Sequence, residues 1–406
     1  MMQQYFNDLA TGIEGSLRDN PESKSPRKMY ALELARLGGR LYSGKDRIAW
    51  CGIVAPFDLL SAMGVTSCFV EFIGAMLAST GMVDTFLETA EHAGFAGDTC
   101  GYHRAVMGAN LKGIMPEPDF LVGTTCPCSG GLAVMENLAL GFDKDLYVIN
   151  VPQESSHDNI RYLADQMKSL VQFVTEHTGE TLDEDRLREA VSYTNQARDL
   201  MNETYQYAKQ VPSPVNGKLL DNFGIAMALL LGTPGAVEVC RTYRDEFKSR
   251  VEKGVAGVEG ERFRLLWIQN RIQFKNPLVE LLEKEYQAVI VNDELNDITW
   301  DTIDPEDPYI GFAQRTISIP FNGYIQHRIQ HMQKLAKEYR IDGAINPCHW
   351  GCRQGTGARG LISEGLNEVG VPVLNLEVDC VDPRNFSEGQ ARTRLEAFLE
   401  MLESRK

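Results

Sequence analysis

The chain has 406 residues, of which 43% are hydrophobic and 24% charged, and these proportions predict a soluble globular protein of two or three domains. Its formal net charge of −16 argues against binding to nucleic acid or to an anionic membrane surface, and no apolar run reaches the roughly 20 residues that span a bilayer. The N-terminus lacks the basic and apolar regions of a secretory signal, so we expect a cytoplasmic protein with reduced thiols.

The first part of the chain is predicted to be a helical segment followed by an α/β domain. Residues 1–46 are polar, with a helix expected at 28–37. The first α/β domain covers 47–153, with strands at 48–54, 65–72, 120–125 and 146–151 and helices at 58–63, 83–92, from Cys100, and at 131–140. This alternation predicts βαβ units and a parallel sheet.

Residues 154–257 have a different pattern and are predicted to form a helical region. Apolar residues recur at helical spacing in 160–177, in 184–210 and from 223 to 253, and 211–217 has the composition of a turn.

Residues 258–406 are predicted to form a second α/β domain. Strands are expected at 264–268, 288–292, 344–346 and 373–378, and helices at 277–285, 324–339, 356–369 and 391–403. The predicted fold class is therefore α/β, with two Rossmann-like or flavodoxin-like parallel-sheet domains and a helical region between or beside them.

Two closely spaced cysteine pairs each follow a predicted strand. Cys126 and Cys128 follow the strand at 120–125, and Cys348 and Cys352 follow the strand at 344–346, while Cys100 precedes a predicted helix. Ligands of open parallel sheets gather outside the carboxyl ends of the strands, and reduced thiols at that position indicate soft-metal binding. An iron–sulfur cluster in the cleft between the two α/β domains, with ligands from both, is the leading hypothesis. The remaining Cys240 and Cys380 fit buried, structural positions.

Two other interpretations apply to the same region. Structural zinc also uses closely spaced cysteine pairs, but zinc sites of that kind usually occupy small knuckles. The segment Gly355-Thr-Gly-Ala-Arg-Gly360 fits the G-x-G-x-x-G dinucleotide pattern, yet the eight residues 347–354 separate it from the predicted strand. We therefore expect these glycines to begin a helix whose N–H groups face a cluster or an anion.

Candidate polar residues lie beside the cysteines. His103 and His349 are candidate ligands or proton donors, and we select His103 as a candidate catalytic residue. An anionic substrate would need basic residues, for which the candidates are Arg104, Lys112, Arg353, Arg359 and Arg384. Of these, Arg353 and Arg359 are selected as cofactor-binding residues. The chain has no phosphate-binding loop with a lysine, so ATP chemistry would come from another protein.

Five sequence blocks carry a family resemblance. They are Cys100-Gly-Tyr-His-Arg-Ala-Val-Met-Gly, Pro118-Asp-Phe-Leu-Val-Gly-Thr-Thr-Cys-Pro-Cys, Cys352-Arg, Val378-Asp-Cys-Val-Asp-Pro-Arg-Asn-Phe386 and Thr393-Arg-Leu-Glu-Ala-Phe398. Over roughly residues 45–405 the chain resembles the 2-hydroxyacyl-CoA dehydratase and benzoyl-CoA reductase family.

The resemblance implies an oxygen-sensitive subunit carrying a [4Fe–4S] cluster on three cysteines, with a fourth position that is not cysteine. In the dehydratases, an ATP-hydrolysing activator protein injects one electron, which reduces the substrate thioester to a ketyl radical anion. This radical expels the 2-hydroxyl group, and loss of a proton and return of the electron yield 2-enoyl-CoA. The implied partners are an acyl-CoA substrate, the activator, and a homologous second subunit.

The resemblance also implies a ligand set. By position the three ligands are Cys100, one of Cys126 and Cys128, and one of Cys348 and Cys352, and we favour Cys100, Cys128 and Cys352. Glu71 falls where the α-type dehydratase subunits carry an acidic residue near the open iron site, so it joins His103 as a candidate catalytic residue; its alternative interpretation is an exposed or capped carboxylate at a strand end.

Two further hypotheses remain open. Cys51 and Cys68 are spaced like an early pair in the double-cubane proteins of this superfamily, so the cofactor is either a single cubane or a double-cubane [8Fe–9S] cluster in a homodimeric reductase. Against the double cubane, Ile317-Ser-Ile-Pro-Phe-Asn322 lies where those proteins carry a Cys-x-Cys segment. A non-enzymatic electron carrier or a cluster-assembly scaffold is the other hypothesis.

Overall fold

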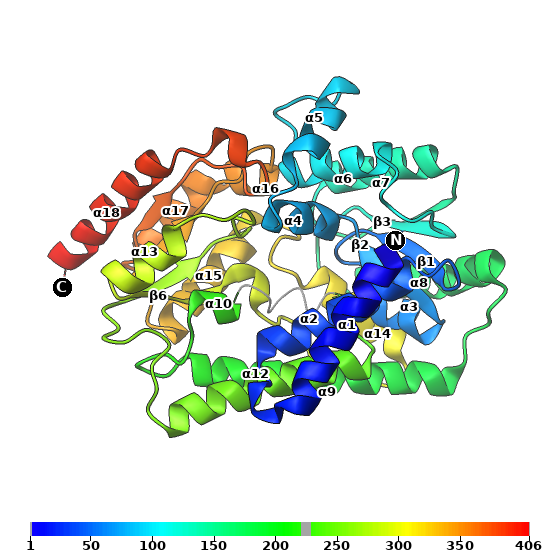
Figure 1. Ribbon diagram of the computed structural model, residues 1–406, viewed down its shortest axis with the longest axis horizontal. Helices are drawn as coiled ribbons and strands as arrows, with labels where there is room; N and C mark the ends of the chain where they lie inside the picture. Colours follow the sequence, from blue (N-terminus) through cyan, green and yellow to red (C-terminus); the bar gives the residue numbers. More distant parts are fainter. Residues whose placement is uncertain (1, 221–228, 406) are drawn as a thin grey trace.

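Two four-stranded parallel sheets form the framework of the computed structural model, which describes residues 2–220 and 229–405 (Figure 1). The first sheet has the order β2-β1-β3-β4 and comprises β1 (Arg47–Cys51), β2 (Val65–Phe69), β3 (Phe120–Thr124) and β4 (Leu146–Ile149). The second has the order β6-β5-β7-β8 and comprises β5 (Phe263–Trp267), β6 (Ala288–Asp293), β7 (Gly343–Asn346) and β8 (Val373–Asn375). The predicted α/β class with two parallel sheets is confirmed.

Several strands are buried on both faces. Every residue of β2, β3, β5 and β6 is buried, because helices cover both sides of a parallel sheet. Strand order reverses between β1 and β3 and again between β5 and β7, and the loops leaving neighbouring strands diverge at such points to leave a crevice. The two cysteine pairs follow β3 and β7, so each pair lies at the crevice of its own sheet.

The helices of the first half pack around the first sheet. They are α3 (Phe57–Ala62), α4 (Glu71–Ser79), α5 (Asp84–His92), α6 (Gly101–Leu111) and α7 (Ser129–Phe142). Helix α4 differs from the sequence expectation, which extends the preceding strand into these residues. Helix α5 projects from the top of the molecule in Figure 1.

The predicted helical region contains α8 (His157–Thr178), α9 (Glu184–Ala208), α10 (Gly217–Leu220) and α12 (Pro234–Glu252). Helices α9 and α12 pack together and run below both sheets in the view of Figure 1. The helix expected from 223 to 253 is wrong in part: residues 221–228 lie outside the described residues, and 230–233 form a turn. Gly232 has a φ of 77° in this turn. Pro234 begins α12, at a position where a backbone N–H would have no partner within the helix, so the lack of an N–H in proline costs nothing.

The second half has more helices than the sequence predicts. They are α13 (Leu278–Glu285), η2 (Glu294–Asn296), α14 (Pro308–Ile317), α15 (Ile325–Glu338), α16 (Arg353–Thr356), α17 (Arg359–Glu368), η3 (Pro383–Asn385) and α18 (Glu388–Ser404). Helix α14 is not among the expected elements, and the helix expected at 356–369 is α17, which begins at Arg359 after the separate short helix α16. The strand expected at 373–378 ends at Asn375, after which the Leu376 N–H still donates to the Asn346 carbonyl at 2.7 Å.

The N-terminal segment is more helical than its polar composition indicates. It consists of α1 (Met2–Asp19), η1 (Pro21–Ser23) and α2 (Pro26–Leu41), of which α1 is an addition to the expected elements. Helix α1 packs so closely on α2 that a Cβ at Gly38 would lie 2.6 Å from the Phe6 ring.

A buried ion pair connects the second half to the first. Arg315 of α14 donates two hydrogen bonds to Asp58 of α3, at 2.6 and 2.8 Å, and the Thr194 hydroxyl donates to the same carboxylate at 3.0 Å. The division of the chain at 46/47, 153/154 and 257/258 stays a prediction. In the described part of the chain, no helix has both the length and the apolar character required to cross a membrane.

Candidate functional site

Three cysteines each stand immediately before the first turn of a helix. Cys100 is the N-cap of α6, Cys128 the N-cap of α7 and Cys352 the N-cap of α16. The Gly131 N–H donates to the Cys128 Sγ at 3.3 Å. Free N–H groups and the dipole at a helix N-terminus favour negative charge, so these positions suit thiolates.

Backbone contacts bring the three cysteine segments together from distant parts of the sequence. Gly351 has a φ of 71°, and a Cβ at this position would lie 2.2 Å from the Cys100 nitrogen. The Gln354 side chain, two residues after Cys352, donates to the Pro127 carbonyl at 2.8 Å. The loop after β7 is thus held against both the start of α6 and the loop after β3.

The Gly351 contact leads to a testable prediction. Alanine at this position combines a left-handed backbone, which costs about 1–3 kcal/mol, with a backbone clash against Cys100. We expect Gly351→Ala to lower the free energy of unfolding by at least about 2 kcal/mol, measured by urea unfolding. Gly370 has a similar φ, 83°, but open space where a Cβ would lie. Gly370→Ala should therefore lower the free energy of unfolding only by the cost of the left-handed backbone. Equal losses in the two variants would contradict the close packing of this loop.

The three thiols also interact electrostatically. Burial raises the pKa of the Cys100 thiol, and the charge of Cys352 raises it further. Burial likewise raises the pKa of Cys128, which the Gly131 N–H lowers and the charges of Glu71 and Cys352 raise. For Cys352 burial again raises the pKa, opposed by N–H groups of the following turn. A bound metal reverses this balance, because a coordinating thiol is deprotonated outright.

Glu71 and His103 lie beside Cys128. Glu71 is the first residue of α4, and its Oε1 lies 3.7 Å from the His103 Nε2. Its Oε2 is buried and has no hydrogen-bond partner among the described residues. Glycines leave the space free: a Cβ at Gly131 would lie 3.3 Å from the Glu71 Oε1, and one at Gly130 would lie 3.0 Å from the His103 Cε1. An unpartnered buried carboxylate oxygen points to a missing ligand at this position.

This donor set fits an iron–sulfur cluster. Three thiols at helix N-termini, with an unpartnered carboxylate oxygen beside one of them, are the soft ligands and the polar neighbour that such a cluster uses. Across residues 2–220 and 229–405, no three His, Cys, Asp or Glu side chains come close enough to hold a single metal ion. A cluster is larger than one ion, and its cysteine ligands bind different iron atoms.

The other four candidate cysteines have different surroundings. The Cys348 Sγ donates to the Asn375 Oδ1 at 3.3 Å, on the side of the second sheet, and burial raises its pKa to about 11. Burial raises the pKa of Cys126 to about 12, with a further contribution from Cys128. Cys51 and Cys68 are fully buried within β1 and β2, where burial and the neighbouring Cys68 raise the pKa of Cys51. Electrostatic contacts link Cys352 to Cys100 and to Cys128, while Cys126 also interacts with Cys128, so the choice of Cys100, Cys128 and Cys352 as ligands stays a prediction.

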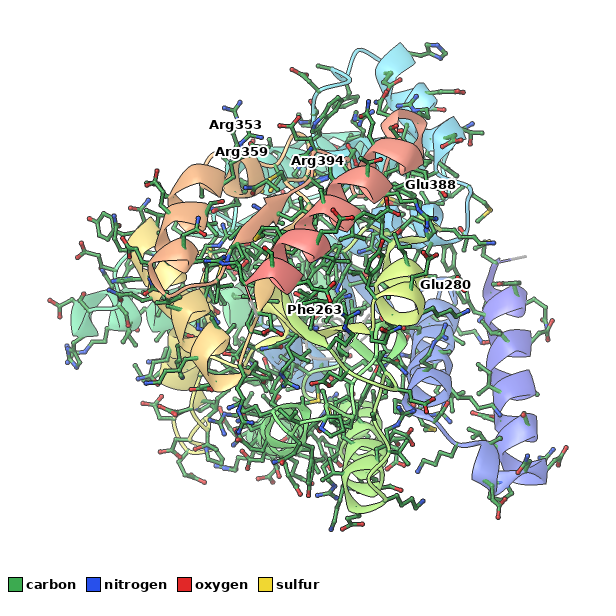
Figure 2. All side chains as sticks on the ribbon, turned by 90° about the vertical axis from the view of Figure 1, so that its left-hand side faces the viewer. Phe263, Glu280, Arg353, Arg359, Glu388 and Arg394 are labelled. Carbon is green, nitrogen blue, oxygen red and sulfur yellow. The ribbon has the colours of Figure 1, made fainter. Side chains whose placement is uncertain are left out.

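Of the predicted basic residues, two are exposed close to the second cysteine pair: Arg353 follows Cys352 directly, and Arg359 interacts with Cys348. Arg353 is exposed at the start of α16, and Arg359 is exposed and pairs with Glu377 at 2.6 Å. Figure 2 shows Arg353 and Arg359 projecting outward from the second half of the molecule, with Arg394 of α18 nearby. The role of both arginines as cofactor-binding residues stays a prediction, and Arg359 is already engaged by Glu377.

Arg104 does not line a pocket, contrary to the expectation for it. Its side chain is only 2% exposed, and it contacts Asp379 and Asp382 at 3.1 Å each and Glu91 at 2.5 Å. Arg384 completes the network through Glu91 and Asp382. Asp379 and Asp382 are not among the predicted site residues, because the arginine that they bind lies in a distant part of the chain.

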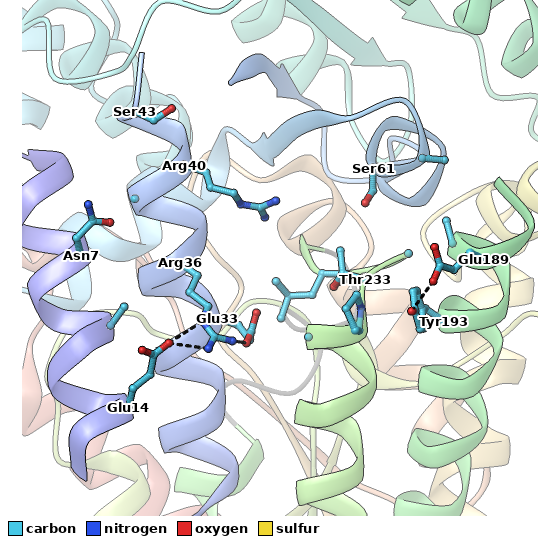
Figure 3. A pocket seen from close by; sticks show the side chains of 18 of the residues that line it. Asn7, Glu14, Glu33, Arg36, Arg40, Ser43, Ser61, Glu189, Tyr193 and Thr233 are labelled. Atoms are coloured by element: carbon cyan, nitrogen blue, oxygen red, sulfur yellow. Dashed lines mark hydrogen bonds and ion pairs between the residues drawn. The ribbon is translucent and has the colours of Figure 1, made fainter. Parts of the chain in front are cut away.

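A separate cavity of about 800 Å³ lies away from the cysteines. Its lining includes Arg40 and Ser43, which precede β1, and Ser61 and Ala62, which precede β2, so it adjoins the amino end of the first sheet (Figure 3). The thiols lie at the carboxyl end. Figure 3 shows Arg36 bound to Glu14 and Glu33 in its wall.

The fold and site define an α/β protein with a thiol-rich centre between two parallel sheets. The profile of the family described as "2-hydroxyglutaryl-CoA dehydratase, D-component" matches residues 52–402, and the chain belongs to this family.

Three relatives show the extent of the similarity. The (R)-phenyllactyl-CoA dehydratase alpha subunit of Clostridium sporogenes is 25% identical over 375 residues, covering 89% of this chain and 91% of the relative. The lactoyl-CoA dehydratase subunit alpha of Anaerotignum propionicum is 24% identical, covering 88% and 91%. A benzoyl-CoA reductase subunit of Thauera aromatica is also 24% identical, covering 96% and 98%.

Proposed function

We propose that this chain is the iron–sulfur subunit of an ATP-activated, oxygen-sensitive 2-hydroxyacyl-CoA dehydratase, which converts a 2-hydroxyacyl-CoA to a 2-enoyl-CoA by elimination of water. The observation that carries the proposal is the grouping of Cys100, Cys128 and Cys352 at three helix N-termini, beside the unpartnered carboxylate of Glu71. Membership of a family with dehydratase relatives supports the reaction type.

A [4Fe–4S] cluster on Cys100, Cys128 and Cys352 is the cofactor that fits this donor set. When bound, such a cluster supplies one electron at low potential and an open coordination position. We also propose that the activator injects this electron at the expense of ATP, and that the substrate then loses its 2-hydroxyl group as a ketyl radical.

Glu71 and His103 are proposed to handle protons in this site. The Glu71 Oε1 lies 3.7 Å from the His103 Nε2, so the two side chains are neighbours without a direct hydrogen bond, and the free Oε2 is available to a substrate proton. The His103 side chain is 7% exposed and that of Glu71 18%, which limits the access of water to the reacting groups.

Arg353 is proposed to bind an anionic group of the acyl-CoA. We expect Arg353→Ala to raise KM for the acyl-CoA about fivefold with kcat changed less than about twofold, because loss of one exposed charge contact removes about 1 kcal/mol of uniform binding. Steady-state kinetics at several substrate concentrations measure both parameters. The control is Arg241→Ala on the remote helix α12, where KM should not change. An unchanged KM for Arg353→Ala would remove this residue from the substrate site.

The proposed partners are an ATP-hydrolysing activator protein and a homologous second subunit. Two of the relatives are named as alpha subunits, which supports a heterodimer over a homodimer.

The test is anaerobic purification with iron and sulfide analysis, followed by assays with activator, ATP and a panel of 2-hydroxyacyl-CoA thioesters. We expect about four irons per chain and formation of a 2-enoyl-CoA with at least one thioester. About eight irons would instead support the double-cubane hypothesis. A protein without iron, or a loaded protein inactive with every thioester, would refute the dehydratase proposal.

A second candidate is a reductase of the benzoyl-CoA reductase type, favoured by a relative that aligns over 96% of this chain. It predicts consumption of an aromatic acyl-CoA in the same activated assay, without formation of a 2-enoyl-CoA.

A further inference from the structure

His349 is buried between the two halves of the molecule and touches a proposed cluster ligand. Its side chain has no exposed surface, and its Nε2 lies 3.1 Å from the Cys100 Sγ. The two residues are 249 positions apart in the sequence. The proposed function assigns this histidine no role.

The protonation of the ring follows from its other nitrogen. The Cys380 backbone N–H points at the His349 Nδ1 at 2.8 Å. A backbone N–H can only donate, so Nδ1 must accept and carry no hydrogen. The ring hydrogen therefore lies on Nε2, the atom that faces the Cys100 sulfur, and His349 donates an N–H···S hydrogen bond.

Asp379 is the group that could favour the opposite tautomer, but its oxygens are already engaged. Its Oδ1 accepts the backbone N–H groups of Val381 and Asp382 at 2.8 and 2.9 Å, and its Oδ2 accepts from Arg104 at 3.1 Å. The His349 Nδ1 is 3.6 Å from Oδ1, which is beyond hydrogen-bond distance.

The orientation of the ring is fixed by packing. Tyr102 meets the imidazole edge to face, with ring centroids 5.4 Å apart and an interplanar angle of 80°. The Tyr102 hydroxyl is held in turn by the Gln273 side chain at 3.0 Å. The donor is therefore held in place before any cluster binds.

We propose that His349 is a positioning residue that adjusts the reduction potential of the cluster through its hydrogen bond to Cys100. This inference rests on the proposed cluster. Hydrogen bonds to cysteine sulfurs withdraw charge and stabilise the reduced state of iron–sulfur clusters, so they raise the potential. The side-chain donor on Cys100 complements the backbone donor on Cys128.

The test compares the anaerobic wild-type protein with His349→Leu, which removes the donor, and His349→Gln, whose amide N–H can replace it. A redox titration followed by electron paramagnetic resonance gives the potential. We expect His349→Leu to lower the equilibrium constant for reduction of the cluster about tenfold. For one electron this corresponds to a reduction potential that is more negative by about 59 mV. His349→Gln should remain close to wild type. The control His331→Leu, on α15, should leave the potential unchanged.

A spectroscopic measurement tests the contact directly. In reduced protein labelled with ¹⁵N-histidine, pulsed electron paramagnetic resonance should detect a ¹⁵N coupling that disappears in His349→Gln and persists in His103→Gln. If His349→Leu takes up no iron, the ¹⁵N couplings of the wild type, His349→Gln and His103→Gln show whether His349 donates to the cluster.

The possible outcomes distinguish a missing cluster from a missing hydrogen bond. Wild-type protein without a cluster would overturn the proposed function and this inference together. A loaded wild type whose potential is unchanged in His349→Leu, or whose ¹⁵N coupling persists in His349→Gln, would overturn this inference alone.

Discussion

Replacing Cys352 by serine is expected to reduce bound iron from about four per chain to background and to lower turnover by more than about 100-fold. The physical reason is that the Cys352 thiol lies with those of Cys100 and Cys128, and its charge raises the pKa of both. Iron analysis and the visible absorption of the anaerobic protein measure the first effect, and the activated dehydratase assay measures the second.

The chain supplies a matched control four residues away. Cys348→Ser should retain iron, because the Cys348 Sγ faces Asn375. The same comparison applies to the other pair, in which Cys128→Ser should lose iron and Cys126→Ser should retain it. Retention of iron in Cys352→Ser together with its loss in Cys348→Ser would show that Cys348, and not Cys352, is the third ligand.

Cys51 and Cys68 test the size of the cluster. Both are buried inside the first sheet, and serine at either position should leave the iron content at about four per chain. Loss of about half of a total near eight irons would favour the double-cubane hypothesis.

Arg104→Met is expected to lower the free energy of unfolding by about 3–5 kcal/mol, because it leaves the buried carboxylate of Asp379 without its cation and removes one of the two arginines that contact Asp382. Methionine keeps much of the side-chain volume, so the loss reports charge and hydrogen bonding rather than a cavity. Urea unfolding followed by circular dichroism measures the change.

The matched control for Arg104 is an arginine in an exposed network. Arg392 on α18 pairs with Glu285 and Glu396 at the surface, and Arg392→Met should cost less than about 1 kcal/mol. Similar losses for the two variants would mean that the buried network contributes no more than a surface pair.

Much of the fold follows from local sequence patterns. Strands buried on both faces appear as short continuous apolar runs, and all eight expected strands are present in the structure. The missed helices have identifiable reasons. Helix α1 has a largely polar surface, and its Phe6 is covered only in the folded chain, where it packs on Gly38 of α2 and stacks on Tyr42. Helix α4 follows β2 without an intervening turn signal.

The site depends less on local patterns. The grouping of cysteines at strand ends is predictable, because parallel strands share one carboxyl edge. The choice between Cys348 and Cys352 cannot be predicted from local patterns. It depends on the folded chain, in which the Cys348 sulfur faces Asn375 and the neighbour of Cys352, Gly351, packs against the start of α6. The burial of Arg104 is also unpredictable, because its aspartate partners lie more than 270 positions away, at separations of 275 and 278 residues.

Residues close together in the chain were enough to establish the α/β class, the position of both cysteine pairs at strand ends, and the family resemblance. The folded chain was needed to establish that Arg104 is a structural cation and that the His349 ring lies against the Cys100 sulfur. These features depend on side-chain directions and on contacts between segments hundreds of residues apart, which local patterns do not specify.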